Sequence, residues 1–363
     1  MSVTLIAAPP SSVQATRPAL GTYAELHRQV EALGLFRPQS GYYLVKAASL
    51  VAMFALGVFG ALWFSHPAIV LAVAAFLGVA NVQAGLLGHD VGHHQLLRSR
   101  RWHHLVALVL ANLLLGLSYS WWIAKHNRHH SFPNEAGKDP DGEVPVLVLC
   151  ADQIPTRHRL LRPLIAVQAF LFVFWLPLHA LSMRGSGVGH LWIARPTYRG
   201  VEVIALVVHA AAYGLLLWLL GSWELAIAFA AVQQGVMGVY SGLVFAPNHK
   251  GMPVLPAESE MEFVRKQVVT ARNVRPGALT DWYYGGLNYQ IEHHLFPSMP
   301  RNRLRRIQAT VRRYCEEHGI PYRETSFMGS YADLFRHLHT VSAPLRRLGR
   351  PFAKGPQAGL GAG

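Results

Sequence analysis

Eight histidines occupy three short clusters in a chain that otherwise contains few polar groups. They are His89, His93 and His94 in HDVGHH, His126, His129 and His130 in HNRHH, and His293 and His294 in QIEHH. Neutral imidazole is the commonest metal ligand, and residues three or four apart share one face of a helix. Protonated imidazoles at this density would repel one another, so the pattern indicates metal binding. One ion takes about four to six ligands, and eight histidines therefore predict two ions.

The ligand types bear on the identity of the metal. Zinc sites often use cysteine, and neither Cys150 nor Cys315 lies near a cluster. A nitrogen-rich, nearly carboxylate-free site for two metals suits iron and oxygen chemistry, although spacing alone leaves copper and zinc open. Helical geometry favours His93 as the partner of His89, whereas a helix that ends at Gly92 would present His94 instead.

Polar residues beside the clusters are candidates for orienting the ligands. Asp90 and Glu292 adjoin histidines and can hold an imidazole N–H, unless they are neighbours by chance. Asp139 either supports HNRHH or only forms the turn that KDPDG favours. Gln290 takes the place in the third cluster that a histidine has in the second. We therefore expect some of these residues to surround the metal ligands.

The composition places this chemistry in a membrane. Of 363 residues, 52% are hydrophobic and only 14% are charged, against about a quarter charged in soluble domains. The net charge of +14 fits a surface of anionic lipid headgroups. No zinc-finger, RNA-binding or basic-zipper pattern is present, so nucleic acid is not an expected partner.

Four apolar segments have the length and composition of membrane spans, and they are 44–65, 67–88, 201–221 and 224–246. Two further apolar runs, 102–124 and 163–183, must not cross if the three clusters lie on one face of the membrane. Arginines flank 163–183 on both sides, and the positive-inside rule assigns such flanks to the cytosol.

The expected fold is therefore an all-α integral membrane protein. Two transmembrane hairpins would carry interfacial helices and a cytosolic helical cap with a di-metal site. The expected organisation is a cytosolic N-terminal arm at 1–40, a membrane and cap domain at 41–345, and a disordered tail at 346–363.

The order HDxGHH, HNxHH and QxxHH, set between two hairpins, resembles the membrane fatty acid desaturases. The resemblance covers roughly 40–340 and includes HSFPNEAGKDPDG and LNYQIEHHLFPSMPR. The glutamine of the third cluster is similar to that of front-end acyl desaturases and bacterial acyl-CoA desaturases. The resemblance implies a non-haem di-iron enzyme that uses O2 to remove two hydrogens from adjacent carbons of a long acyl chain.

The resemblance also implies a ligand outside the clusters and a set of partners. His249, preceded by Asn248 in FAPNHKG, follows the fourth span, where desaturases of this kind have a further histidine. The alternative is an interfacial histidine at a helix end. Many front-end desaturases have a fused cytochrome b5 domain with an HPGG motif, which this sequence lacks. We therefore expect a separate electron donor, a ferredoxin or a cytochrome with its reductase, and a cell-membrane enzyme with its active site on the cytosolic side.

Two other functions use the same features. Hydroxylases, ketolases and alkane monooxygenases act on lipids or hydrocarbons with the same kind of metal centre, and their products gain oxygen rather than a double bond. A metal-ion transporter also uses histidine clusters, but transport sites lie near mid-membrane, often with carboxylates. The clusters here lie at span ends and in loops, which favours an enzyme.

Overall fold

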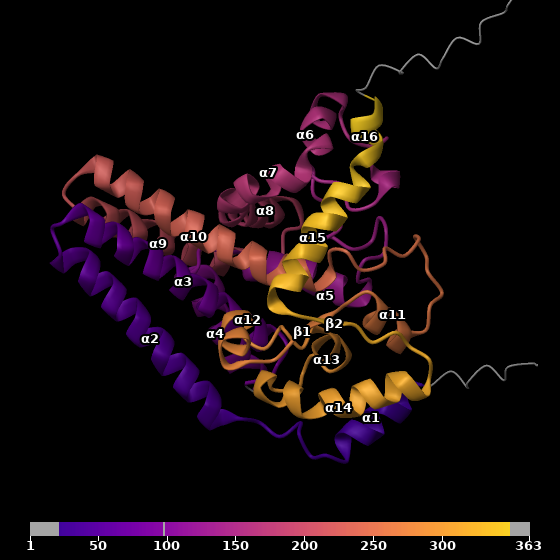
Figure 1. Ribbon diagram of the computed structural model, residues 1–363. Helices are drawn as coiled ribbons and strands as arrows, with labels where there is room; N and C mark the ends of the chain where they lie inside the picture. The colour runs from indigo at the N-terminus through magenta and orange to yellow at the C-terminus, as the bar shows by residue number, and fades with distance from the viewer. Residues whose placement is uncertain (1–21, 97–98, 349–363) are drawn as a thin grey trace, which may run out of the picture.

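The computed structural model describes residues 22–96 and 99–348, and the regular structure there is almost entirely helical (Figure 1). The predicted helical class is confirmed. Part of the predicted arm, 1–21, and most of the predicted tail, 349–363, lie outside the described residues.

Four long apolar helices form the two hairpins (Figure 1). Each is long and apolar enough to cross a membrane, and they are α2 (Ser40–Trp63), α3 (Pro67–Gly92), α9 (Arg199–Leu219) and α10 (Trp223–His249). Pro67 presets the first turn of α3, and the Ser222 hydroxyl caps α10 by accepting the N–H of Leu225 at 3.3 Å. The helices match the four predicted spans, and the crossing itself remains a prediction.

Glycines allow α10 to pack closely against its neighbours. A Cβ added at Gly78 of α3 would lie 2.7 Å from the carbonyl oxygen of Gln233 on α10. Membrane helices commonly pack through such small residues, because lipid gives no hydrophobic drive for their association. This packing fixes the C-terminal ends of α3 and α10 relative to each other, and these ends carry His89 and His249.

The two remaining apolar runs are sharply bent. The first, bent by 110°, comprises α4 (Arg100–Leu108), the π-helix η1 (Val109–Leu114) and α5 (Tyr119–Ser131). The second, bent by 95°, comprises η3 (Arg159–Leu161), α6 (Arg162–Ala166), α7 (Gln168–Trp175), η4 (Leu176–Leu178) and α8 (His179–Ile193). A re-entrant loop and a broken span share this shape, so the non-crossing of 102–124 and 163–183 stays a prediction.

The segments after α10 form a cap. The cap packs over the ends of the hairpins that carry His89 and His249 (Figure 1). Its elements are α11 (Phe263–Val269), β1 (Asn273–Val274), α12 (Ala278–Tyr284), α13 (Gln290–Leu295), α14 (Arg301–Glu317), β2 (Glu324–Thr325), α15 (Phe327–Val341) and α16 (Ala343–Leu348). The two short strands pair in parallel, and η2 (Ala151–Gln153) lies in the loop after α5.

The N-terminal helix belongs to this cap. In α1 (Tyr23–Glu31), Leu26 and Val30 are fully buried in a cluster with Leu304 and Val311 of α14. The Tyr314 hydroxyl also donates to the carbonyl of Thr22 at 3.0 Å. The described part of the predicted arm is therefore packed against the cap.

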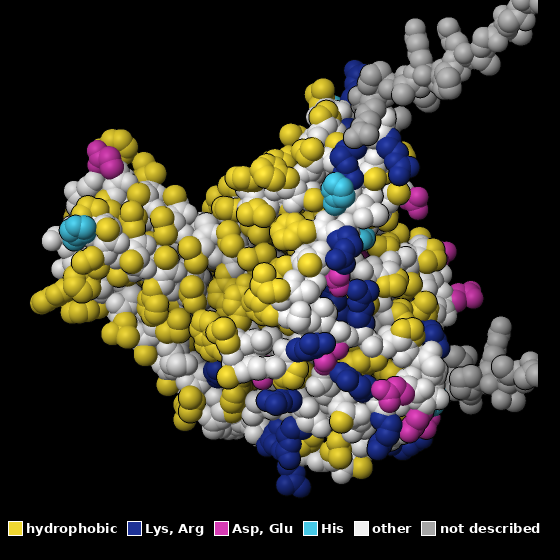
Figure 2. Space-filling view, viewed as in Figure 1, with side chains coloured by type: hydrophobic (Ala, Val, Ile, Leu, Met, Phe, Trp, Pro, Cys, Tyr) yellow, Lys and Arg dark blue, Asp and Glu magenta, His cyan; other side chains and the backbone are white. Residues whose placement is uncertain are grey.

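The surface divides into an apolar part and a charged part (Figure 2). Hydrophobic side chains cover the hairpins on the face shown, whereas Lys and Arg gather over the cap. Exposed residues on the hairpins include Leu44 at 71% and Trp218 at 75%. Apolar surface of this extent is unusual in water, and it fits a surface in contact with lipid.

Candidate metal centre

Four helices carry the clustered histidines or His249 at their C-terminal ends. The histidines in these last turns or cap positions are His89 and His93 of α3, His129 and His130 of α5, His249 of α10, and His293 and His294 of α13. Packing of α3 on α10, the bend before α5 and the cap bring the four helix ends together. Segments far apart in the sequence thus form one site.

Five imidazoles form the first group, which we call the five-histidine group: His89, His93, His126, His130 and His293. One ring nitrogen from each lies within 4.8 Å of the corresponding atom of every other member. Nε2 of His126 lies 2.7 Å from Nε2 of His93 and 3.1 Å from Nε2 of His130. Nε2 of His293 lies 3.2 Å from that of His130. Nitrogens that converge in this way are arranged as metal ligands.

Three buried imidazoles form the second, three-histidine group: His129, His249 and His294. Nε2 of His129 lies 3.3 Å from Nε2 of His249. The amide nitrogen of Gln290 lies 3.0 Å from the same atom of His249, and the Gln290 oxygen accepts from Asn248 at 3.0 Å. The glutamine of the third cluster therefore faces this group.

The two groups adjoin each other. The rings of His130 and His294, one from each group, stack with centroids 4.3 Å apart. Adjacent residues on a helix point about 100° apart, so the HH pairs of the second and third clusters each send one ring to each group. His130 and His293 join the first group, and His129 and His294 join the second. This divergence gives the paired histidines a geometric role.

Asp139 contacts a histidine of the second cluster, which is one of the two roles that the sequence allowed. Its carboxylate oxygens lie 3.0 and 3.1 Å from Nδ1 of His129. They also accept the backbone N–H groups of Asn134 and Asp141, each at 2.8 Å. The carboxylate thus fixes both the KDPDG turn and the imidazole, and it leaves Nε2 of His129 facing the group.

Two further residues that orient imidazoles were not predicted from the sequence. The carbonyl of Thr270 lies 3.0 Å from Nδ1 of His249, and the amide oxygen of Gln267 lies 2.8 Å from Nδ1 of His294. Gln267 also donates to the carbonyl of His130 at 2.9 Å. Both supports lie in or next to α11, where no metal-binding pattern occurs, so only the tertiary structure reveals them.

The short contacts of Asp90 and Glu292 are with residues of the cap rather than with an imidazole. Asp90 pairs with Arg301, Nε to Oδ2, at 3.0 Å, and its nearest oxygen lies 3.5 Å from His89. Glu292 accepts from Asn273 at 2.7 Å and from the Tyr322 hydroxyl at 2.8 Å. Burial raises the pKa of Glu292 to about 6. Both carboxylates therefore anchor the histidine-bearing segments to the cap.

His94, the alternative ligand of the first cluster, lies outside both groups. Helix α3 does end at Gly92, which was expected to present His94, but His93 as its C-cap still joins the five-histidine group, and His94 has a φ of 58°. The N–H of His94 bonds the carbonyl of Val91 at 2.9 Å, and that of Gln95 bonds Asp90 at 3.1 Å, as in a Schellman motif. This turn directs His94 onto His103, with ring centroids 3.8 Å apart. The structure therefore brings His93 into the site.

A buried carboxylate on α9 holds the start of α5. Glu202 is 1% exposed and accepts from Asn112 at 3.1 Å, from the Ser118 hydroxyl at 2.8 Å and from the N–H of Ser120 at 3.2 Å. Backbone groups at a helix start lack intrahelical partners, and inside an apolar environment they need another acceptor. Glu202 supplies one and so helps to position α5. No local sequence pattern marks Glu202 for this role.

The donor set fits metal ions. Burial and the neighbouring imidazoles hold the pKa of His293 and His294 well below the ordinary value. The rings are therefore neutral, which is the form that binds a metal. Nε2 of His294 is buried and has no hydrogen-bond partner among the described residues. An orphaned buried nitrogen is costly unless a ligand satisfies it.

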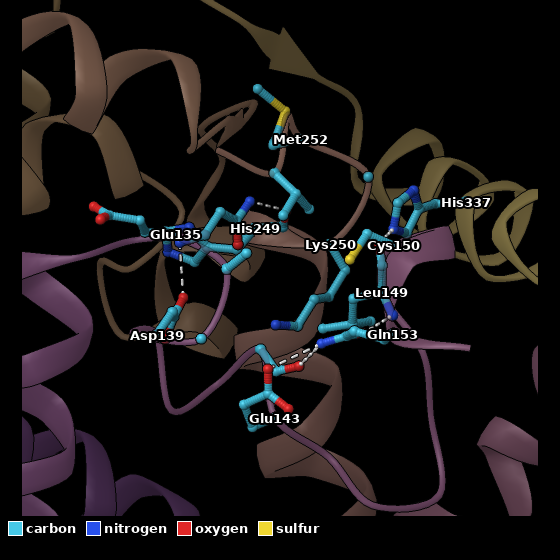
Figure 3. A pocket seen from close by; sticks show the side chains of 16 residues that line it. Glu135, Asp139, Glu143, Leu149, Cys150, Gln153, His249, Lys250, Met252 and His337 are labelled. Carbon is cyan, nitrogen blue, oxygen red and sulfur yellow. Dashed lines mark hydrogen bonds between the residues drawn. The ribbon is translucent and has the colours of Figure 1, made fainter. Parts of the chain in front are cut away.

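A small pocket lies beside His249 (Figure 3). His249 and Asp139 line it together with Lys250 and His337. Its cavity of about 20 Å³ has room for about one water molecule. Lys250 donates to the carbonyl of Asp141 at 2.7 Å, which links the end of α10 to the KDPDG turn.

Comparison with known proteins agrees with this arrangement. A profile of the fatty acid desaturase family matches residues 63–326. An acyl-lipid (9-3)-desaturase from Physcomitrium patens is 32% identical over 321 residues, which make up 85% of this chain and 60% of that protein. A Delta(8)-fatty-acid desaturase from Euglena gracilis is 31% identical over 313 residues, 83% of this chain and 74% of the relative. A Delta(6)-fatty-acid desaturase from Caenorhabditis elegans is 29% identical over 348 residues, 91% and 77% of the two chains.

The chain thus spans less than two thirds of the first of these relatives and about three quarters of the other two. The matched region contains all three clusters and His249. The family predicted from the order of the clusters is therefore confirmed: the chain belongs to the fatty acid desaturase family.

Proposed function

We propose that the chain is an O2-dependent desaturase that introduces a double bond into a long acyl chain, with two irons held by the five- and three-histidine groups. The convergence of eight imidazoles from four helices carries the proposal. The relatives described above are acyl-lipid and fatty-acid desaturases, which supports a long acyl chain as substrate.

The reaction removes one hydrogen from each of two adjacent carbons. With O2, two electrons and two protons, these hydrogens leave as two molecules of water. A methylene group offers no acidic proton and no electrophile, so bound iron would supply the oxidant. The chain's own residues position the ligands and exclude water: Asp139, Thr270 and Gln267 each fix one imidazole.

Expression in a host that supplies candidate donors tests the activity. Mass spectrometry of fatty acid methyl esters is expected to show a new double bond, which His293→Ala abolishes. His339→Ala, an exposed histidine on α15, is the matched control and is expected to retain the product. A hydroxylated product would instead support the monooxygenase alternative.

Metal analysis of purified protein tests the centre directly. We expect about two irons per chain, as two groups of ligands imply. A stoichiometry near one zinc without iron would contradict the di-iron proposal. Metal uptake into vesicles without turnover would revive the transporter alternative.

The proposed topology has four spans, with the cap and the five- and three-histidine groups on the cytosolic side of the cell membrane. Cysteines introduced at Ser186 and Lys138 should react with an impermeant reagent from the same side, and one at Ser65, in the α2–α3 turn, from the other. A Cys150→Ser background removes a partly exposed thiol, whereas Cys315 is buried. Labelling of Ser186 and Lys138 positions from opposite sides would refute the topology.

The proposed electron donor is a separate protein, a ferredoxin or a cytochrome with its reductase. Exposed arginines on α14 and α15, including Arg313 and Arg336, offer a basic surface for an acidic partner. Purified enzyme with each donor in turn, followed by single-turnover product analysis, identifies the one that supports the reaction. Turnover without any added protein donor would contradict this part of the proposal.

A further inference from the structure

An apolar groove runs between α2 on one side and α4 with η1 on the other. Its volume is about 910 Å³, near the upper end of the range of about 300–1,000 Å³ for small-molecule sites. The floor residues Leu50, Leu87 and Leu110 are at most 7% exposed, whereas Leu44 and Val51 at the rim are 71% and 69% exposed. The groove is therefore a concave surface with a packed floor and open sides.

The length of the groove matches the apolar core of a bilayer. On α2 its lining extends from Ser40 to Val58, which is about 27 Å at 1.5 Å per residue. The hydrocarbon core of a membrane is about 30 Å thick. In the proposed topology the groove opens to acyl chains rather than to water. An acyl chain that fills it gains the packing contacts that an empty groove lacks.

The cap-facing mouth of the groove is basic. Its walls begin at Ser40 of α2 and Trp102 of α4. Arg37 lies three residues before Ser40 and Arg101 directly before Trp102, and both are exposed. Guanidinium groups bind phosphate well, and an exposed tryptophan such as Trp102 is common at headgroup level. The mouth thus complements a phospholipid headgroup.

The same end of the groove adjoins the first cluster. Leu87 precedes His89 by two residues on α3, and Leu96 follows His93 by three. Tyr43 in the groove wall donates to Gln95 at 2.7 Å, and Gln95 accepts the N–H of Arg301 at 3.0 Å. An acyl chain in the groove would therefore lie close to the chain segments that hold the five-histidine group.

We infer that this groove binds one acyl chain of a membrane phospholipid, with the phosphate beside Arg37 and Arg101, and that the enzyme takes its acyl substrate as a phospholipid ester rather than a CoA thioester. The inference rests on the proposed desaturase function. It names the carrier of the substrate and the surface that receives it.

Photolabelling tests the groove without any need for turnover. The purified protein is placed in nanodiscs with phosphatidylcholine that carries a diazirine in one acyl chain, and labelled peptides are identified after illumination. Label is expected in 40–58 and 102–114. Val51→Trp is expected to reduce it about tenfold, because an indole and an acyl chain cannot share the space. The matched control is Val45→Trp, since Val45 is 67% exposed on the same helix but outside the groove lining.

Kinetics test the carrier. Val51→Trp is expected to raise KM for a phospholipid-bound acyl chain about fivefold or more at unchanged kcat, and to leave KM for the CoA thioester of the same acid unchanged. The double variant Arg37→Gln, Arg101→Gln should act in the same direction. Arg28→Gln, at an exposed arginine on α1 outside the groove, is the charge control.

The outcomes separate the groove from the proposed function. Label mainly outside 40–58 and 102–114, or equal loss in both tryptophan variants, overturns the groove. Label in the groove with no change in KM for the phospholipid shows a structural lipid and overturns the carrier. A labelled groove in a protein that forms no double bond with any donor contradicts the desaturase function and leaves the lipid site standing.

Discussion

Substitution of Asp139 separates two roles of one buried carboxylate. The side chain is 1% exposed, and both oxygens lie within 3.1 Å of Nδ1 of His129. The same oxygens accept two backbone N–H groups, from Asn134 and Asp141. Asp139→Asn keeps one oxygen in nearly the same volume, whereas Asp139→Ala removes every acceptor.

The two variants should differ in size and kind of effect. Loss of a carboxylate that orients a metal-binding histidine costs about 10- to 100-fold in metal affinity, or about 1.4–2.8 kcal/mol. Asp139→Ala also leaves two buried N–H groups without an acceptor, at about 1–3 kcal/mol each. The two N–H groups bond different oxygens of Asp139, and the amide of Asp139→Asn keeps only one acceptor oxygen. We therefore expect Asp139→Asn to weaken iron binding and to lower the free energy of unfolding by about 1–3 kcal/mol, and Asp139→Ala to lower it by about 2–6 kcal/mol.

Iron retained per chain after equilibration with increasing chelator measures the affinity. Unfolding of the metal-free proteins in detergent measures the effect on the loop alone. Asp152→Asn, at an exposed carboxylate in η2, is the control and should match the wild type in both assays. If Asp139→Asn keeps its iron at the same chelator concentration as the wild type, the contact with His129 does not orient the ligand and the reasoning is wrong.

Three other results are expected. His249→Ala should lose iron and activity as fully as His293→Ala, whereas His94→Ala should retain both; iron retained by His249→Ala would show that His249 is structural. Glu202→Ala should lower the unfolding free energy by about 2–4 kcal/mol because several buried donors lose their acceptor, and Glu202→Gln should recover part of this loss; equal stability of the two variants would contradict the account of α5. Removal of iron by a chelator should lower the midpoint of thermal unfolding, and Fe²⁺ should restore it, because a ligand that binds only the folded state stabilises it; an unchanged midpoint would argue against metal at these histidines.

Local spacing accounts for much of the site. His89 and His93, and likewise His126 and His130, are four residues apart on a helix, and each pair lies in one group. His129 is only three residues from His126, yet it joins the other group. A step of three residues turns a side chain about 60° away and a step of four about 40°, so His130 stays with His126. Spacing thus predicts pairs, and only the positions of the helices decide where each ring lies.

The supports of the ligands depend on contacts that no local pattern contains. Asp90 is 211 residues from Arg301, its partner in an ion pair at 3.0 Å. Glu292 accepts a hydrogen bond from the Tyr322 hydroxyl, and Glu202 of α9 accepts one from the backbone N–H of Ser120 at the start of α5. A carboxylate beside a histidine in the sequence can therefore have its shortest contact with a distant residue, because its side chain leaves the backbone in a different direction.

The placement of the histidines at helix ends bears on how a cationic centre is stabilised in an apolar surrounding. Eight neutral imidazoles supply no negative charge, so two divalent ions would keep their full charge. The last turns of α3, α5, α10 and α13 all face the two groups with their histidines. A helix C-terminus carries a partial negative charge and stabilises a nearby cation by about 0.3–1 kcal/mol, and by up to about 2 kcal/mol when partly buried. Four such ends together contribute about 1–4 kcal/mol, and the carboxylate of Asp139 adds to this through His129. The fold can therefore hold a strongly positive centre with ligands that are all nitrogen, because backbone dipoles take over part of the role that carboxylate ligands have elsewhere.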